Sequence, residues 1–215
     1  MYLDFDQTPP RDRYKLLTSL VVPRPIALVS TLDAAGRVNA APYSFFNVFS
    51  QEPAICVLGI ERRSENELKD TAAHIERSGE FVVNLVDEDL APAMNVCATD
   101  FPAGYSELEP AGLTIAASTR IATPRIAEAP AALECRNHST MMLGSARRLV
   151  IGEILAVHIR DSLVDAERLY IDHQRYRPVG RLTGGGYCTT TDTFKLERET
   201  FAAWQARQTG EDHTA

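Results

Sequence analysis

Short segments rich in branched and aromatic apolar residues recur along the chain, and turns that contain proline or glycine separate them. Such residues suit the half-buried surface of a sheet, so the pattern predicts strands. Helices do not alternate regularly with these segments, which favours a β-barrel over the parallel sheet of a nucleotide-binding fold. We expect strands at 26–31, from 38 onward, and at 54–60, 80–86, 113–117, 131–137 and 149–159.

Helices are expected at four places between these strands. In the first, at 11–20, Tyr14, Leu17 and Leu20 are spaced three residues apart and predict one apolar face. The others are predicted at 64–78, around 90–97 and at 200–207, and in the second of these Leu90, Met94 and Cys97 fall on one helical face. Irregular loops are predicted at 101–112 and 176–192.

The helix within 64–78 carries signals for both of its ends. Ser64 with Glu67 has the spacing of a capping box, and Asp70 is an alternative N-cap for a later start. Gly79 occupies the usual position after the last helical residue, where a left-handed conformation is favoured.

Composition and charge exclude several classes of protein. The 215 residues are 45% hydrophobic and 24% charged, which is ordinary for a soluble globular chain. Because no linker or repeat divides them, we expect one domain over 1–215. The net charge of −7 argues against a nucleic-acid partner, because an acidic chain gains nothing from the release of counterions from a polyphosphate backbone. No apolar run reaches membrane-spanning length, and no signal peptide is evident. The four cysteines are scattered and form no zinc motif, so we expect free thiols and a cytoplasmic location.

Motifs of the common catalytic machineries are absent from the sequence. We find no nucleophile elbow, no P-loop, no zinc-protease motif and no dinucleotide-binding fingerprint. The five histidines show no metal-binding spacing. If the protein is an enzyme, we therefore expect a cofactor to carry the chemistry.

Two stretches have a specialised composition. Residues 39–47 combine small residues, past which a flat ligand could approach the backbone, with polar side chains, aromatics and Pro42; the alternative is an ordinary strand exit. Arg62, Arg63 and Lys69 lie near a helix start, where unpaired N–H groups and the helix dipole attract anions. The alternative there is a solvated basic surface.

Taken in order, these stretches resemble the flavin reductase-like family. The resemblance covers about 16–196 and implies a mainly β fold, a six-stranded antiparallel Greek-key split β-barrel with flanking helices. It also implies a homodimer that holds FMN near the subunit interface. The segments that carry it are PRPIALVST at 23–31, 39–47, KDT at 69–71, GEFVVNL at 79–85, ALEC at 132–135, IGEI at 151–154 and PVGRL at 178–182.

The resemblance also implies where FMN would bind. Residues 39–45 would line the flavin ring, largely through backbone groups, and Lys69, Thr71 and Ser64 would hold the phosphate. His138 is expected to face the flavin as a catalytic residue, although a solvated histidine after a strand is the alternative. The expected cofactor-binding residues are Thr31, Asn39, Ala41, Pro42, Tyr43, Ser44, Phe45, Asn47, Ser64, Lys69, Asp70, Thr71 and Tyr187.

The function implied by the resemblance is an NAD(P)H-dependent flavin reductase. Such an enzyme transfers hydride from NADH or NADPH to the flavin N5, and some members supply reduced flavin to a partner monooxygenase. Two alternatives stay open. One is an FMN protein that reduces its own small substrate or relays electrons, and the other is a ligand-binding barrel without a redox role.

Overall fold

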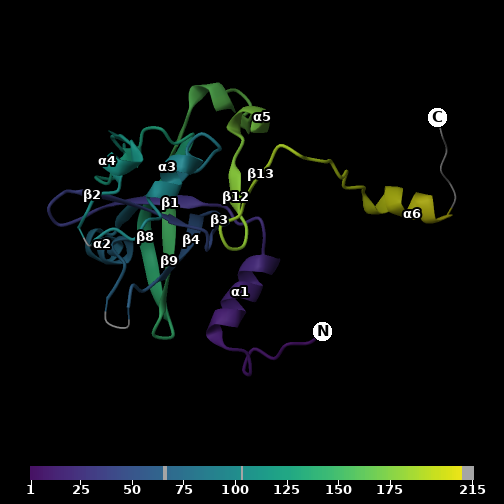
Figure 1. The fold of residues 1–215 in the computed structure, drawn as a ribbon. Coiled ribbons are helices and arrows are strands. Elements are labelled where there is room, and N and C mark those ends of the chain that lie inside the picture. Colours follow the sequence, from purple (N-terminus) through teal and green to yellow (C-terminus); the bar gives the residue numbers. More distant parts are fainter. Residues whose placement is uncertain (65–66, 103, 210–215) are drawn as a thin grey trace.

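The computed structural model describes residues 1–64, 67–102 and 104–209, and one antiparallel sheet forms its centre. Seven strands lie in the order β2-β1-β5-β8-β9-β4-β3 (Figure 1). The prediction of a mainly β, antiparallel fold is confirmed, with seven strands in place of six. The strands are β1 (Ala27–Leu32), β2 (Val38–Tyr43), β3 (Phe46–Gln51), β4 (Ala54–Glu61), β5 (Glu80–Leu85), β8 (Ala131–Leu143) and β9 (Arg147–Ile159).

The two edge strands of this sheet follow one another in the chain. β2 ends at Tyr43 and β3 begins at Phe46, so only Ser44 and Phe45 connect them. Seven flat strands about 4.8 Å apart would place the outer pair roughly 29 Å from each other, whereas this link spans at most about 11 Å. The sheet therefore curves into a barrel. At the closing corner the Phe45 carbonyl accepts a hydrogen bond from the N–H of Gly59 in β4 over 2.8 Å.

Of the seven strands in the central sheet, sequence analysis misses β3, and it also predicts a loop where the short strands β12 and β13 form. Val48 and Phe49 are 54% and 69% exposed, so the segment lacks the alternation of buried and exposed residues that marks a strand. A bulge between Val48 and Ser50 also shifts its register with β4. Strands β8 and β9 are longer than expected, at 13 residues each, because they continue as a hairpin beyond the barrel core.

Short helices and short strand pairs surround the barrel (Figure 1). The C-terminal segment leads away from the barrel to α6, so that this helix lies apart from the rest of the chain. The helices are α1 (Pro10–Leu20), α2 (Asp70–Ser78), α3 (Ala91–Val96), α4 (Leu108–Ala111), η1 (Asp161–Leu163), α5 (His173–Tyr176) and α6 (Phe201–Thr209). The strand pairs are β6 (Ile115–Ala116) with β7 (Arg125–Ile126), β10 (Val164–Asp165) with β11 (Tyr170–Ile171), and β12 (Val179–Arg181) with β13 (Tyr187–Thr189).

Two groups of buried apolar residues fill the fold. The first includes Leu58 and Phe81, and the inward faces of the strands contribute most of it. The second lies under α3, where Leu90, Met94 and Cys97 are all buried, as their helical spacing predicts. Strand β2, on which the candidate site is built, contributes to both groups, through Tyr43 to the first and through Ala40 to the second.

Helix α1 forms as predicted, but its apolar face is not covered by the described part of the chain. Tyr14, Leu17 and Leu20 are 54%, 43% and 76% exposed. Thr18, on another face, is the residue of α1 that is buried. The helix with its predicted apolar face is therefore present, and that face stays largely exposed in the single chain.

The start of α2 also differs from the expectation. Ser64 and Glu67 pair with each other as an isolated bridge before the helix and do not form a capping box. The helix begins at Asp70 with Lys69 as N-cap, and no side chain caps it. Both predicted caps are therefore wrong, whereas Gly79 ends the helix in the left-handed conformation at φ 71°, as predicted.

Candidate functional site

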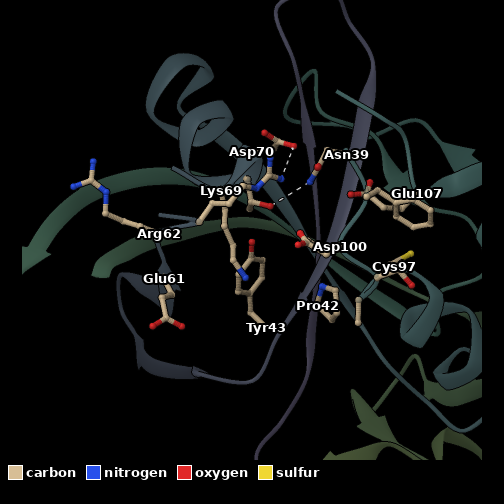
Figure 2. A pocket seen from close by; sticks show the side chains of 16 residues that line it. Asn39, Pro42, Tyr43, Glu61, Arg62, Lys69, Asp70, Cys97, Asp100 and Glu107 are labelled. Carbon is tan, nitrogen blue, oxygen red and sulfur yellow. Dashed lines mark hydrogen bonds and ion pairs between the residues drawn. The ribbon is translucent and has the colours of Figure 1, made fainter. Parts of the chain in front are cut away.

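A cavity of about 560 Å³ opens where β2, the start of α2 and the segment after α3 meet. In Figure 2, Asn39, Pro42 and Tyr43 enter it from β2, Lys69 enters it from the start of α2, and Glu107 closes the opposite side. The cavity thus joins the two stretches that the sequence singles out, although they are about thirty residues apart.

The outer edge of β2 forms one wall of this cavity. The Ser106 hydroxyl donates to the Val38 carbonyl over 2.7 Å, and Glu107 Oε2 accepts the Ala40 N–H over 2.9 Å. Alternate residues of an antiparallel strand point their backbone groups the same way. Pro42 is the next residue on this edge and has no N–H, which is tolerated on an edge strand. The edge therefore has its donors satisfied before any ligand binds.

The first turn of α2 faces the cavity at its other end. The first N–H groups of a helix have no partner within the helix, and no side chain caps those of α2. Asn39 Nδ2 donates to Thr71 Oγ1 over 3.2 Å, which fixes that hydroxyl beside the helix end. Among the described residues, no carboxylate forms an ion pair with Lys69. A helix end with free donors and an unpaired lysine is a favourable place for an anion.

Two carboxyl groups beside this end would repel an anion if both were charged and unpaired. Arg63 offsets one of them, since its Nη2 lies 3.3 Å from Asp70 Oδ2. The other, Glu107, is 8% exposed, and burial raises the pKa of its carboxyl. Burial favours the neutral form because a charge loses its hydration. Both effects reduce repulsion toward a bound anion.

Tyr43 contributes a donor that the protein itself does not use. The residue is 9% exposed, and within the described part of the chain its buried hydroxyl makes no hydrogen bond of ordinary length. The Thr71 side chain lies near enough to lower the pKa of Tyr43, but burial has the larger effect. Burial raises the pKa of Tyr43 to about 12, so the phenol is neutral at physiological pH and can donate. Buried polar groups without a partner are rare and costly. Tyr43 is one of the residues that line the cavity, so a ligand bound there is a candidate acceptor for this hydroxyl.

Comparison with known proteins now identifies the family. The model of the flavin reductase like domain matches residues 19–180. This chain belongs to the flavin reductase-like family. Membership implies that it binds a flavin and carries out oxidoreductase chemistry.

Solved structures agree with this assignment. The chain is 39% identical to 2-nitrobenzoate 2-nitroreductase of Pseudomonas fluorescens, with 94% of this chain and 98% of that chain covered and a TM-score of 0.86. It is 33% identical to nitrilotriacetate monooxygenase component B of Bacillus cereus, with 91% and 98% covered and a TM-score of 0.87. A split-barrel protein of Shewanella frigidimarina, at 21% identity and a TM-score of 0.78 over 93% and 100% of the chains, shares the fold.

This flavin reductase-like chain brings together many of the residues predicted from its sequence. A smaller cavity of about 220 Å³ adjoins the first, shares Pro42, Tyr43 and Ala98 with it, and contains Ser44 and Tyr187. The Tyr187 ring lies under the Arg181 guanidinium at 4.5 Å. The predicted residues that line the larger cavity are Asn39, Ala41, Pro42, Tyr43, Lys69, Asp70 and Thr71.

Five predicted residues line neither cavity of this family member. Thr31 is buried in β1, where its hydroxyl lies 3.0 Å from His74 Nδ1. Phe45 is turned toward α1, since its ring stacks on Tyr14 at 6.2 Å. The remaining three, each of them exposed, are Asn47, Ser64 and His138.

The position of His138 bears directly on its predicted catalytic role. It lies on the exposed side of β8, at the irregularity in register between Asn137 and Ser139. That position is outside the 560 Å³ cavity and the 220 Å³ cavity that adjoins it. The single chain therefore gives no support for a catalytic His138, and the role stays a prediction.

Glu107 and the segment 97–101 are cavity residues that the sequence does not indicate. Glu107 reaches the site through a hydrogen bond to Ala40, which is 67 positions away in the chain. It lies within 101–112, where the mixture of proline, glycine and aromatic residues predicts only an irregular loop. Its one distinguishing property, a buried carboxyl, exists only in the folded chain.

Among the described residues, no group of three or more His, Cys, Asp and Glu side chains could hold a metal ion. Within the same ranges, no helix has both the length and the apolar character needed to cross a membrane.

Proposed function

We propose that this protein binds FMN in the two adjoining cavities and is an NAD(P)H:flavin oxidoreductase. The observation that carries the proposal is the partnerless hydroxyl of Tyr43 beside the uncapped start of α2 and the unpaired Lys69. A neutral buried donor, free N–H groups and a lysine in one place are suited to a phosphate group.

The residues present fit the phosphate end of FMN. Lys69 would supply charge, the Thr71 hydroxyl and the first N–H groups of α2 would supply hydrogen bonds, and Tyr43 would donate the remaining one. The cavities measure about 560 and 220 Å³, within the range of roughly 300–1,000 Å³ that is common for small-molecule sites.

The residues also fit a flat ring beyond the phosphate. Ala41 and Pro42 leave room along the β2 edge, and the Tyr187 ring lies farther along in the adjoining cavity. When bound, the flavin supplies the redox chemistry by accepting hydride at N5. The chain's own contribution is to orient the ring and exclude water, which is positioning rather than acid–base catalysis. A role for His138 would require a second subunit to bring it to the cavity.

A homodimer and a cytoplasmic location belong to the same proposal. The exposed apolar residues of α1 and β3, among them Leu17, Leu20 and Phe49, form the kind of surface that a second copy of the chain covers. The four free cysteines suit a reducing compartment.

A monooxygenase that consumes the reduced flavin is a further candidate partner, because the relative from Bacillus cereus is a monooxygenase component B.

A second candidate function is reduction of a small substrate by FMN that stays bound. The relative from Pseudomonas fluorescens is a 2-nitrobenzoate 2-nitroreductase. In this chain, the adjoining cavity offers an aromatic platform at Tyr187 and a cation at Arg181, which would suit an aromatic anion.

Spectroscopy of the purified protein separates these functions. We expect FMN to bind with a shifted visible spectrum, and anaerobic NADH or NADPH to bleach it. Continued turnover of added FMN supports the reductase. Bleaching without turnover of free FMN, but with reduction of a nitroaromatic acid, supports the second candidate. A protein that neither binds nor reduces FMN contradicts both.

A further inference from the structure

A second and separate cavity, of about 280 Å³, lies where β7, the start of β8 and the end of β9 meet. Basic side chains from different elements converge on it: Arg125 from β7, His158 from β9, and Arg160 just after β9. None of its lining residues lines either of the two cavities proposed for FMN. The cavity therefore needs an explanation of its own.

Two of these basic residues are anchored by carboxylates beneath them. His158 Nε2 contacts Glu134, a fully buried carboxylate that also accepts the N–H groups of Thr119 and Arg120 over 2.7 Å each. Arg160 Nη1 lies 3.8 Å from Asp87 Oδ2. These contacts fix the two side chains at the rim of the cavity, and Asp87 offsets the charge of Arg160.

Arg125 has no such partner. Its Nε atom is buried without a hydrogen bond, and within the described ranges no carboxylate forms an ion pair with its guanidinium. A half-buried charge without a partner is costly, and a guanidinium matches the two oxygens of a planar or tetrahedral oxyanion. Asp161 is the carboxylate that also lines the cavity, but it is exposed to solvent, where water screens its charge.

We propose that this cavity binds a small organic oxyanion, a carboxylate or a phosphate ester, through Arg125. The remaining walls include Ala127, Ala129, Pro130 and Ala132, which would contact a compact apolar body beside the charged group. The volume lies near the lower end of small-molecule sites, which excludes a whole dinucleotide. The site is distinct from the proposed FMN cavity and does not depend on it.

The test is an anion titration of the full chain saturated with FMN, so that the first anion site is occupied. Inorganic phosphate and benzoate are titrated separately by calorimetry, into wild type, Arg125→Gln and Arg168→Gln. Arg168 is an exposed arginine outside both sites and serves as the matched control. We expect saturable binding of one anion per chain, weakened about tenfold or more in Arg125→Gln because a charge-assisted contact is lost, and unchanged in Arg168→Gln.

The outcomes are decisive in either direction. Saturation by benzoate alone identifies carboxylates as the ligand class, and saturation by phosphate alone identifies phosphate esters. No saturable binding of either anion, or equal binding by Arg125→Gln and wild type, overturns the proposal. Repeating the titration in Lys69→Ala without FMN gives the same information if the proposed function is wrong. Unaltered FMN affinity in Arg125→Gln separates the two sites.

Discussion

Glu107 Oε2 accepts the backbone N–H of Ala40 over 2.9 Å, from the outer side of the edge strand β2. The neighbouring Ser106 holds the carbonyl of Val38 on the same edge. Two side chains from a loop thus take the place of an adjacent strand. The edge is protected from pairing with another chain, and the wall of the cavity is held in place before a ligand arrives.

We predict that Glu107→Gln changes how stability depends on pH. Burial raises the pKa of Glu107, so the folded chain holds this proton more tightly than the unfolded chain. Wild type therefore loses stability as pH rises from the unfolded-state pKa through the raised folded-state pKa. Glutamine keeps an acceptor for Ala40 but does not titrate. Urea unfolding at a series of pH values should show the variant gaining stability relative to wild type across this range, and a constant difference would contradict the assignment.

Lys69→Ala should weaken FMN binding by about 1.5–3 kcal/mol, the usual size of a hydrogen bond to a charged group. The side chain lies at the uncapped start of α2 and lines the cavity. Fluorescence quenching of FMN on titration with protein measures the dissociation constant. Lys15→Ala removes an exposed lysine from α1 and is the matched control. Equal dissociation constants for all three proteins would place the phosphate elsewhere.

Gly152→Ala should destabilise the barrel by about 1–3 kcal/mol, as expected for overpacking in a core. A Cβ atom at this position would lie 2.4 Å from Cζ of Phe81, inside the barrel. Gly185→Ala is the control, because a Cβ there meets nothing within 4 Å. Chemical denaturation should separate the two variants, and equal midpoints would show that Phe81 moves aside without cost.

How far the sequence predicts this structure depends on the range of the interaction. Gly79 and the helical spacing of Leu90, Met94 and Cys97 are local signals, and the structure confirms them. Strand β3 is missed because its exposed Val48 does not follow the usual pattern, and its pairing with β4 is a tertiary property.

The residues of the candidate site likewise include some with a local sequence signal and others that only tertiary contacts bring to the cavity. Lys69 and Asn39 are predicted from the composition of their own stretches, and both line the cavity. Glu107 arrives from a loop far away in the chain, and its burial cannot be read from neighbouring residues. The Phe45 ring does not line the cavity but packs on Tyr14 of α1, and this contact joins segments about thirty residues apart.

Native-state thiol labelling should find one reactive cysteine of the four. Cys188 is partly exposed, whereas Cys56, Cys97 and Cys135 are buried. Burial raises the pKa of Cys97 to about 12, and contact with Cys56 together with burial raises the pKa of Cys135. The hydrogen bond with Cys135 lowers the pKa of Cys56, but that side chain is 0% exposed, so a reagent does not reach it in the native state. Because the thiolate is the reactive form, a chromogenic disulfide reagent should release one equivalent quickly, and all four only in denaturant. Cys188→Ser should abolish the fast phase, and a fast phase that persists would contradict this order.

Tyr43→Phe should change stability and FMN affinity in opposite directions. Without ligand, the variant no longer buries a hydroxyl that lacks a partner, so its free energy of unfolding should rise by up to about 1–3 kcal/mol. With ligand, the lost donor should weaken FMN binding about tenfold or more. Thermal melts and FMN titrations measure the two effects, with Tyr170→Phe, at a 71% exposed position, as control. If FMN affinity is unchanged while stability rises, the hydroxyl does not contact the ligand, and the phosphate must be held by α2 and Lys69 alone.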